Sequence, residues 1–501
     1  MAGSAFKRLV VQTSHYSLTS LFVMVAGLVT FPLLTRLFSV ADYGIMSLVG
    51  ATISVAVALG KVGVQHSIIR YHSEIVAGHS RYSLAQLSST TMLAMLATGG
   101  TAAFMLAIGS QLLPARWLGD PRVPGLMAIV SIVVAVQVLE SVLVNFIRAE
   151  QRTSELMIYQ VLKKYLGLGL VLFAVLAIAR SLTAFYTASA ITECLAIGIL
   201  ALVMFRRGSP PRPSPTQFSR PLYFELLRFG VPMLIGYELS GIVLSVGARY
   251  VIDGALGETE LGLYAAAYNL CQYIQSVIIT SVNQAIMPLY MQMWDQKGRD
   301  ETVDFISRSL RTYALLGAPV IAGLAAVGPE LLPALASDKY AGAAVILPWV
   351  IAGMVVDGTS SMLGAGLFIH RKTRIIMGIV GSGALLNLVL NIVLVPRIGI
   401  LGSAIATLVS YAVNALALAL AARNLLRVQI PWGTILRAGS AAVLMWLALR
   451  NFYTGHRFAT IGLRLGAGVT IYGLAIMLLD RDARGLARKA VSRFGWRFRA
   501  S

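Results

Sequence analysis

Long apolar runs recur from one end of this 501-residue chain to the other, and they constrain its fold more than any other feature. Most contain about 18 residues or more, enough for a helix to cross the roughly 30 Å hydrocarbon core of a bilayer. The runs are continuous and do not alternate between apolar and polar residues, so a transmembrane barrel is excluded. The sequence therefore predicts an all-α polytopic membrane protein.

We expect about fourteen transmembrane helices. Hydrophobic residues make up 57% of the chain and charged residues only 12%, about half the charged share of soluble proteins. Lys7 and Arg8 precede the first run, but this run is long and no cleavage site follows it, so we expect no signal peptide. The expected spans are Ser17–Thr35, Ile45–Ile69, Leu84–Pro114, Leu126–Ile147, Leu156–Ala179, Leu182–Phe205, Phe229–Ile252, Leu261–Met287, Ile306–Val327, Ala341–Ile369, Ile375–Val395, Ile398–Ala422, Ile435–Leu449 and Ala459–Leu479.

The formal net charge is +20, but its distribution indicates membrane topology and not a nucleic-acid partner. If the N-terminus is cytoplasmic, 30 of the 41 lysines and arginines fall on the cytoplasmic side, 10 fall on the opposite side, and Lys61 lies within a span. Positive residues concentrate on the cytoplasmic side of membrane proteins. We therefore expect both termini to be cytoplasmic.

A weak internal repeat runs through the chain. Gly44 and Gly262 follow the first and the seventh expected spans at an offset of 218 residues, and Thr153 and Thr373 are offset by 220. An even number of crossings separates these landmarks. The repeat therefore predicts two six-helix lobes of the same orientation in a pseudo-twofold repeat, plus two C-terminal helices. In alternating-access transporters, such repeats hold the substrate site between them.

The domain boundaries follow from this repeat and from the composition of two segments. Arg206–Pro221 contains five prolines and four arginines and cannot form a helix, so we expect a linker. The arginine-rich C-terminal residues are typical of an interfacial segment. The expected parts are an N-terminal lobe (1–205), a cytoplasmic linker (206–222), a C-terminal lobe (223–430), two additional transmembrane helices (431–480) and a basic cytoplasmic tail (481–501).

A tight helical hairpin is expected within Leu385–Tyr411. Asn387 and Asn391 are four residues apart, so they share one helical face at membrane depth. Pro396 and Gly399 are expected to break the backbone before the second helix. The two amides are candidates for lining a polar path, and interhelical hydrogen bonds explain them equally well.

Basic residues within the spans need an explanation, because a charge at the middle of a membrane costs roughly 2.5–3.5 kcal/mol. Lys61 is expected inside the second span, where it could contact a phosphate group; the alternative is that it snorkels or pairs with Glu140 or another acid. Of the adjacent Lys163 and Lys164, at most one should face a cavity squarely. The candidate substrate-binding cations are Lys61, Arg36, Arg70, Arg249, Lys163 and Lys164, with interfacial anchoring as the alternative for the arginines.

Four acidic residues also lie within the expected spans: Glu140, Glu193, Glu238 and Asp357. A carboxylate buried in the membrane can bind and release a proton during a transport cycle. We therefore consider Glu140, Glu238 and Asp357 as coupling or gating residues. The alternative is that each of them neutralises a buried cation.

No catalytic motif is visible, and the loops are too short to house a catalytic domain. The sequence lacks a Walker glycine–lysine loop, an HExxH zinc motif and a nucleophile elbow. We therefore expect a transporter and not an enzyme, without a metal or other cofactor apart from a coupling proton or sodium ion.

Four stretches, together with the span count, resemble a known family. They are TRLFSVADYG after the first span, RFGVPMLIG in the seventh (Arg228–Gly236), LGLYAAAYNL in the eighth (Leu261–Leu270) and PRIGILGSAIAT in the hairpin. In these motifs the chain resembles the Wzx-type polysaccharide-biosynthesis flippases of the multidrug/oligosaccharidyl-lipid/polysaccharide exporter superfamily.

The resemblance implies two six-helix bundles in a V, two extra C-terminal helices, and first-lobe cations that face a central cavity. It also implies that an undecaprenyl-pyrophosphate-linked oligosaccharide crosses from the cytoplasmic to the periplasmic leaflet of the bacterial inner membrane, for synthesis of exopolysaccharide, capsule or O-antigen. The implied partners are this lipid-linked oligosaccharide, membrane lipids, and polysaccharide polymerase and export machinery.

Three other functions stay open. A cation-coupled multidrug exporter of the same superfamily would require an acidic cavity for cationic drugs, whereas the first lobe is basic. A membrane polysaccharide polymerase or ligase, which is an enzyme, should carry a long extracytoplasmic loop, and none is expected. A peptidoglycan-precursor flippase fits the four motifs less well.

Overall fold

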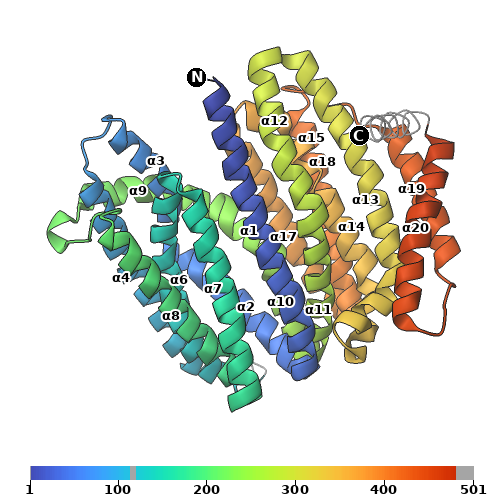
Figure 1. Ribbon diagram of the computed structural model, residues 1–501, viewed down its shortest axis with the longest axis horizontal. Helices are drawn as coiled ribbons and strands as arrows, with labels where there is room; N and C mark the ends of the chain where they lie inside the picture. Colours follow the sequence, from blue (N-terminus) through green and yellow to red (C-terminus); the bar gives the residue numbers. More distant parts are fainter. Residues whose placement is uncertain (1, 113–119, 481–501) are drawn as a thin grey trace, which may run out of the picture. The chain divides into compact units, whose positions relative to one another are not determined.

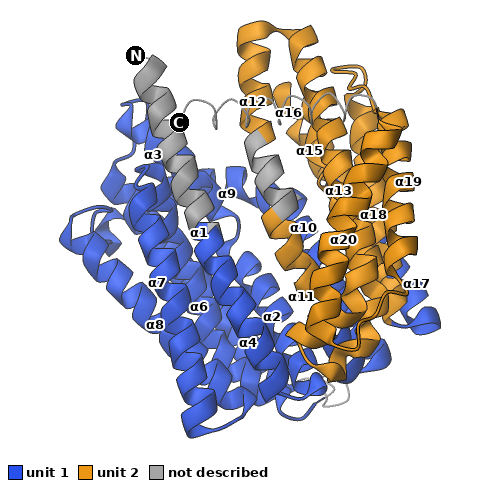
Figure 2. Cartoon of the chain, turned by 45° about the vertical axis from the view of Figure 1, so that its right-hand side comes forward, with its two compact units in different colours: residues 1–265, 380–399 blue, residues 266–379, 400–501 orange. Residues whose placement is uncertain are grey.

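The computed structural model describes residues 2–112 and 120–480, without the side chains of residues 2–18, 20, 237 and 278–285. All regular elements in these ranges are helical (Figure 1). The chain forms two compact units, coloured separately in Figure 2: unit 1 contains residues 1–265 and 380–399, and unit 2 contains residues 266–379 and 400–501. The predicted basic tail, residues 481–501, lies outside the described residues.

Unit 1 contains most of the N-terminal helices. Its helices are α1 (Ala2–Leu37), α2 (Val40–Lys61), α3 (Val64–Val76), α4 (Leu84–Leu112), α6 (Val123–Ala149), α7 (Thr153–Phe173) with its π-helical extension η1 (Ala174–Ile178), α8 (Leu182–Arg206), the short η2 (Pro215–Gln217), α9 (Arg220–Met233), the π-helical η3 (Leu234–Leu239), α10 (Ser240–Leu256), the first part of α11 (Glu258–Ile274) and the second part of α17 (Thr373–Ile398). Since α9 and α10 belong to unit 1, the units do not follow the expected lobe boundaries, and the division into lobes stays a prediction.

Unit 2 contains the remaining helices. They are η4 (Gln275–Thr280), α12 (Ser281–Lys297), α13 (Arg299–Leu335), η5 (Asp338–Ile346), α14 (Leu347–Asp357), α15 (Ser360–Leu363), α16 (Ala365–Ile369), α18 (Ile400–Ala422), α19 (Trp432–Leu449) and α20 (Arg457–Leu479). The last two helices pack on α13 through small side chains such as Ala326, Ala441 and Ala442. Arg464 of α20 is almost fully buried and pairs with Glu330 of α13 at 2.6 Å.

Eleven of the fourteen expected spans coincide with helices that are long and apolar enough to cross a membrane. The seventh expected span is the pair α9–α10, which bends by 46° after Pro232. The first and the eighth fall on α1 and on α11–α12, which do not meet the same criterion within the described residues. The protein is thus a multi-pass helical membrane protein, and the exact number of fourteen is not confirmed.

The second expected span, Ile45–Ile69, is not one continuous helix. Its first helix, α2, begins at a capping box in which Ser39 and Asp42 satisfy each other's backbone N–H groups. It ends at Lys61, because Val62 (φ 48°) and Gly63 (φ 78°) both adopt the left-handed conformation before α3 begins. A β-branched residue rarely adopts this conformation, which costs about 1–3 kcal/mol, so the surrounding structure must hold the break in place.

A close backbone contact holds this break. A Cβ atom on Gly63 would lie 2.1 Å from the carbonyl oxygen of Gly230 in α9, and a Cβ on Gly230 would lie 2.3 Å from that of Gly63. Only glycine fits at either position. The end of α2 is therefore fixed against α9, just before α9 passes into η3.

A second glycine contact corresponds to the repeat seen in the sequence. A Cβ on Gly44 would lie 1.9 Å from the carbonyl oxygen of Glu258, and a Cβ on Gly262 would lie 1.9 Å from that of Val40. Val40 and Glu258 are separated by the same 218 residues as the two glycines. The repeat therefore takes the form of a reciprocal contact between the first turns of α2 and α11.

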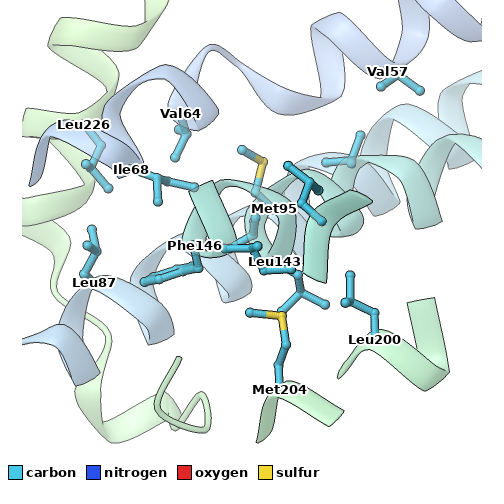
Figure 3. Packing of buried hydrophobic residues seen from close by; sticks show 14 of the residues in the cluster. Val57, Val64, Ile68, Leu87, Met95, Leu143, Phe146, Leu200, Met204 and Leu226 are labelled. Carbon is cyan, nitrogen blue, oxygen red and sulfur yellow. The ribbon is translucent and has the colours of Figure 1, made fainter. Parts of the chain in front are cut away.

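A cluster of buried apolar side chains packs α2, α3, α4, α6, α7, α8 and α9 of unit 1 together (Figure 3). Phe146 and Leu143 of α6 lie within it, close to Met95 of α4 and Ile68 of α3, and each is at most 1% exposed. Lipid tails are as apolar as these side chains, so the gain is mainly dispersion from close packing and not removal from water. The cluster holds α3 in place beyond the break.

The backbone of the expected linker is hydrogen-bonded to side chains of α4. The carbonyl of Pro211 accepts a hydrogen bond from the Ser88 hydroxyl, and the backbone N–H groups of Ser214 and Ser219 donate to the hydroxyls of Ser89 and Thr90, at 2.6, 3.0 and 2.9 Å. The three hydroxyl residues of α4 are fully buried. These bonds explain why the three hydroxyl groups are buried. They satisfy backbone groups of the linker that would otherwise need hydrogen bonds to water.

Both helices of the expected hairpin are present, and the break between them lies at one residue. Pro396 remains inside the last turn of α17, so the prediction that it breaks the backbone is wrong. Gly399 separates α17 from α18 with φ 65°, a conformation that glycine adopts without a steric penalty.

The glycine contacts lead to a test of the fold. We expect Gly44→Ala and Gly262→Ala each to lower the stability of the purified protein by about 1–3 kcal/mol, because the new methyl group meets backbone that cannot move aside. The matched control is Gly50→Ala in α2, where a Cβ meets nothing within 4 Å. Thermal unfolding in detergent measures the effect, and equal melting temperatures for Gly44→Ala and Gly50→Ala would contradict the reciprocal contact.

Candidate functional site

The two interrupted helices of unit 1 bring Lys61 and Glu238 together. Lys61 is the last residue of α2 and Glu238 lies in η3; Lys61 Nζ is 3.7 Å from Glu238 Oε1, and the side chains are 21% and 19% exposed. From α3, Gln65 Nε2 donates to Glu238 Oε2, and His66 Nε2 lies 3.1 Å from the same oxygen. We call Lys61, Gln65, His66 and Glu238 the helix-break site.

The helix-break site joins two residues that the sequence placed in separate roles. Lys61 was expected to be a substrate cation and Glu238 a coupling residue, and the alternative for Lys61 was a pair with Glu140 or another acid. The structure pairs Lys61 with Glu238 instead. A pair of this kind is neutral as a whole, which lowers the cost of holding each charge at membrane depth.

A second ionic cluster lies among α6, α7 and α8 of unit 1. Lys163 Nζ is 2.6 Å from Glu140 Oε2 and 2.6 Å from Glu193 Oε2. The Tyr159 hydroxyl donates to Glu140 Oε1 at 2.7 Å, and Gln137 Nε2 donates to Glu193 Oε1 at 2.9 Å. Glu140 is thus the partner of Lys163, and this cluster accounts for one of the two adjacent lysines.

The other lysine, Lys164, lines a cavity of about 500 Å³ beside the cluster. The wall of this cavity also includes Gln160 and Thr192, together with the three charged residues of the cluster. In the described part of the chain, Lys164 has no ion-pair partner. Unit 1 therefore contains one paired and one unpaired lysine at this cavity.

In the described part of the chain, the three predicted arginines make no hydrogen bond or ion pair with either cluster. Arg36 is exposed in the last turn of α1, and Arg249 Nη1 donates to the carbonyl of Ser47 at 3.2 Å. Arg70 donates to Glu74 at 2.8 Å and lies over the ring of Phe229. This hydrogen bond and the charge of Glu74 raise the pKa of Arg70. The structure does not bring the arginines together with Lys61, and their role in binding stays a prediction.

The remaining predicted residues lie elsewhere. Asp357 ends α14 in unit 2, and within the described ranges no hydrogen bond or ion pair engages its carboxylate. Asn387 and Asn391 are buried in α17, where Asn391 Nδ2 donates to the carbonyl of Asn387 at 2.8 Å and to its side-chain oxygen at 3.1 Å. The two amides therefore bond to each other, and their predicted role in a polar path is untested.

Sequence reasoning missed Gln65 and His66. In a continuous helix Gln65, four residues after Lys61, would share its face, whereas His66, five residues after it, would point elsewhere. The break at Val62 and Gly63 turns α3 so that both reach Glu238. The only local sign of this break in the sequence was Gly63.

Among the described residues, no group of three or more His, Cys, Asp or Glu could hold a metal ion.

These features define a class: a multi-pass helical membrane protein with half-buried ion pairs between its helices. Residues 33–345 match the family described as "Polysaccharide biosynthesis protein". The match covers more than half of the chain, so the protein belongs to this family.

Two named relatives are similar over part of the chain. The succinoglycan biosynthesis transport protein ExoT of Rhizobium meliloti (strain 1021) is 23% identical over 359 residues, which are 72% of this chain and 66% of that protein. The probable low-salt glycan biosynthesis flippase Agl15 of Haloferax volcanii is 24% identical over 189 residues, 36% of this chain and 40% of that protein. The chain thus spans less than two thirds of the length of either relative.

Solved structures share the fold. The lipid II flippase MurJ in an inward closed conformation has a TM-score of 0.75 and 14% identity, with 93% of this chain and 99% of that chain covered. An inward-facing multidrug resistance transporter of the MATE family, in the MOP superfamily, has a TM-score of 0.64 and 16% identity, with 81% and 94% covered. At these identities the similarity concerns the fold alone.

The ionic cluster of α6–α8 gives a second prediction. Lys163→Met leaves Glu140 and Glu193 as two uncompensated carboxylates, so we expect a loss of about 3–5 kcal/mol of stability. Glu193→Gln keeps the pair of Lys163 with Glu140 and should cost less. The matched control is Lys164→Met, which removes the neighbouring lysine without breaking an ion pair among the described residues. Similar melting temperatures for Lys163→Met and Lys164→Met would contradict the arrangement.

Proposed function

We propose that this protein is a flippase that moves a lipid-linked oligosaccharide from the cytoplasmic to the periplasmic leaflet of the bacterial inner membrane. Membership of the polysaccharide biosynthesis family supports the proposal. So do the names of the relatives, which refer to succinoglycan transport and to glycan flipping, and the fold shared with a lipid II flippase. The proposed carrier is undecaprenyl pyrophosphate, and the glycan serves exopolysaccharide, capsule or O-antigen synthesis.

The observation that carries the proposal is the ion pair of Lys61 and Glu238 at two helix breaks inside membrane-spanning helices. A pyrophosphate group can replace Glu238 as the anionic partner of Lys61, since both are oxyanions. Lys61 is therefore the proposed contact to the substrate head group. The sugar and pyrophosphate stay hydrated as they cross, because desolvating such charges costs several kcal/mol or more, while the polyprenyl tail stays in lipid.

The exchange of partners implies a coupling ion. When Lys61 turns to pyrophosphate, Glu238 loses its cationic partner, and a carboxylate left alone in the membrane is strongly unfavourable. Uptake of a proton or a sodium ion by Glu238 removes this penalty. Gln65 and His66 remain as hydrogen-bond partners of the carboxyl group during the exchange.

The proposed orientation follows from the distribution of basic residues. With both termini cytoplasmic, most lysines and arginines lie on the cytoplasmic side. The proposed activity is transport by alternating access and not catalysis, in line with relatives and structural neighbours that are named as transporters and flippases. A polysaccharide polymerase and export machinery would use the translocated oligosaccharide.

Lys61 offers the direct test. In a strain that depends on this protein for its surface polysaccharide, we expect Lys61→Ala to reduce export about tenfold or more, since it removes a charged contact to the head group. Lipid-linked oligosaccharide should accumulate in the cytoplasmic leaflet. Lys61→Arg keeps the positive charge and should retain part of the activity.

A paired variant separates substrate binding from fold stability. Lys61→Met combined with Glu238→Gln leaves a neutral pair with no uncompensated charge. If the ion pair were only structural, this double variant at normal protein levels would restore export. We expect it to remain defective, and full export in Lys61→Ala cells would also refute the proposal.

The coupling ion has its own test. In proteoliposomes, we expect an imposed proton or sodium gradient to accelerate transport by the wild-type protein, and Glu238→Gln to abolish this acceleration. The same assay with Asp357→Asn, in unit 2, shows whether the carboxylate of Asp357 also takes part in coupling. Transport that is indifferent to both gradients would remove Glu238 and Asp357 as coupling residues.

A further inference from the structure

Unit 1 contains a second cavity, separate from the helix-break site and from the cavity of Lys164. It has a volume of about 430 Å³ and lies among α2, α4, α6 and α10. Most of its wall is apolar, with leucine, valine and methionine side chains such as Leu48, Met105 and Met127. The polar groups in the wall are few: Thr52, Ser110, Tyr250 and Asp253.

Three of these polar groups already have hydrogen-bond partners. The hydroxyls of Thr52 and Tyr250 lie 3.1 Å apart, Thr52 also donates to the carbonyl of Leu48 at 3.0 Å, and Ser110 donates to that of Ala107 at 3.0 Å. Hydroxyl groups satisfied in this way do not require a ligand.

The fourth polar group of the wall, the carboxylate of Asp253, differs from these three hydroxyl groups. Its Oδ1 atom is buried and accepts no hydrogen bond in the described part of the chain, and no ion pair reaches the carboxylate there. Arg249, one turn earlier on α10, donates instead to the carbonyl of Ser47. The charged group that acts on Asp253 most directly is Glu258, which has the same sign. The cavity thus holds a negative charge that the described protein groups do not neutralise.

The unpartnered carboxylate and the apolar wall of the cavity indicate which class of ligand fits it. A buried carboxylate oxygen without a partner is costly, and a cation nearby removes this cost. A bare metal ion would leave most of the volume and the apolar wall unused. A neutral sugar would bury several hydroxyls against a wall with almost no free acceptors or donors, and pyrophosphate would be repelled by Asp253. The half-exposed ring of Tyr250 adds a face that attracts cations.

We propose that this cavity binds an organic monocation with a large apolar body, held by the charge of Asp253. The proposal goes beyond the proposed glycan transport, since the ligand has the opposite charge to a pyrophosphate and binds apart from Lys61. The protein would therefore carry a binding site for lipophilic cations in addition to its head-group site.

Tetraphenylphosphonium is the probe, because its charge is permanent and its body is apolar. Equilibrium dialysis of the full-length protein in nanodiscs, with empty nanodiscs as the blank, gives the dissociation constant. We expect saturable binding that Asp253→Asn weakens about tenfold or more, as for the loss of an opposite charge in a poorly hydrated site. Tetraphenylborate, an anion of the same shape, should not bind at this site.

A second variant tests the cavity without touching the carboxylate. Gly109 lines the cavity, and a Cβ there meets nothing within 4 Å, so Gly109→Leu fills the volume without a clash at its Cβ. The matched control is Gly100→Leu in the same helix, where a Cβ is equally free but the residue does not line the cavity. We expect Gly109→Leu to abolish binding and Gly100→Leu to retain it.

Three outcomes would overturn the proposal: no saturable binding to the wild-type protein, unchanged affinity in Asp253→Asn, or equal affinity for the anionic probe. Lys61→Ala should bind the probe normally, and Asp253→Asn should still export polysaccharide. The failure of the cation site therefore leaves the proposed transport intact, and a failure of the transport proposal leaves the cation site intact.

Discussion

The backbone contact between Gly63 and Gly230 is the constraint on which the arrangement of unit 1 depends. It can form only because neither residue carries a Cβ, and it holds Val62 in a backbone conformation that a β-branched residue normally avoids. The break that results ends α2 at Lys61 and redirects α3, while α9 passes into the π-helical η3 just beyond the contact. Lys61, Gln65, His66 and Glu238 can therefore meet, although they come from segments far apart in the chain.

Charge pairing then separates two kinds of residue in unit 1. Lys163 is held by two carboxylates and by the groups around them, so it stabilises the packing of α6, α7 and α8. Lys61 has one carboxylate at a longer distance, which makes its partner easier to exchange. Lys164 and Asp253 have no ion-pair partner in the described ranges, and each lines its own cavity. The cavity of Lys164 is lined by two lysines and two glutamates, whose formal charges cancel, whereas Asp253 is the only charged residue that lines the other cavity.

The sequence predicts the apolar helices well, because a membrane span needs only length and apolar composition, and eleven expected spans match helices of the structure. It also locates charges at membrane depth and the offset that relates Gly44 to Gly262. It does not predict which charges pair. For Lys61, Glu140 or another acid stayed open as a partner, because the pair with Glu238 depends on the positive φ of Val62, which has no signature in composition. Asp253 was overlooked, since the absence of a partner becomes visible only in three dimensions.

The amino-acid composition of the segment between α8 and α9 gives a misleading impression of how well this segment tolerates insertions and deletions. Five prolines and four arginines suggest a loose connection in which insertions or deletions have little effect. Its backbone is instead hydrogen-bonded to three buried hydroxyls in consecutive positions of α4. A change of even one residue would shift this register and leave polar groups of α4 without partners in an apolar setting. For evolution and for protein engineering alike, this short segment is part of the folded unit, and tags or fusions are better placed elsewhere.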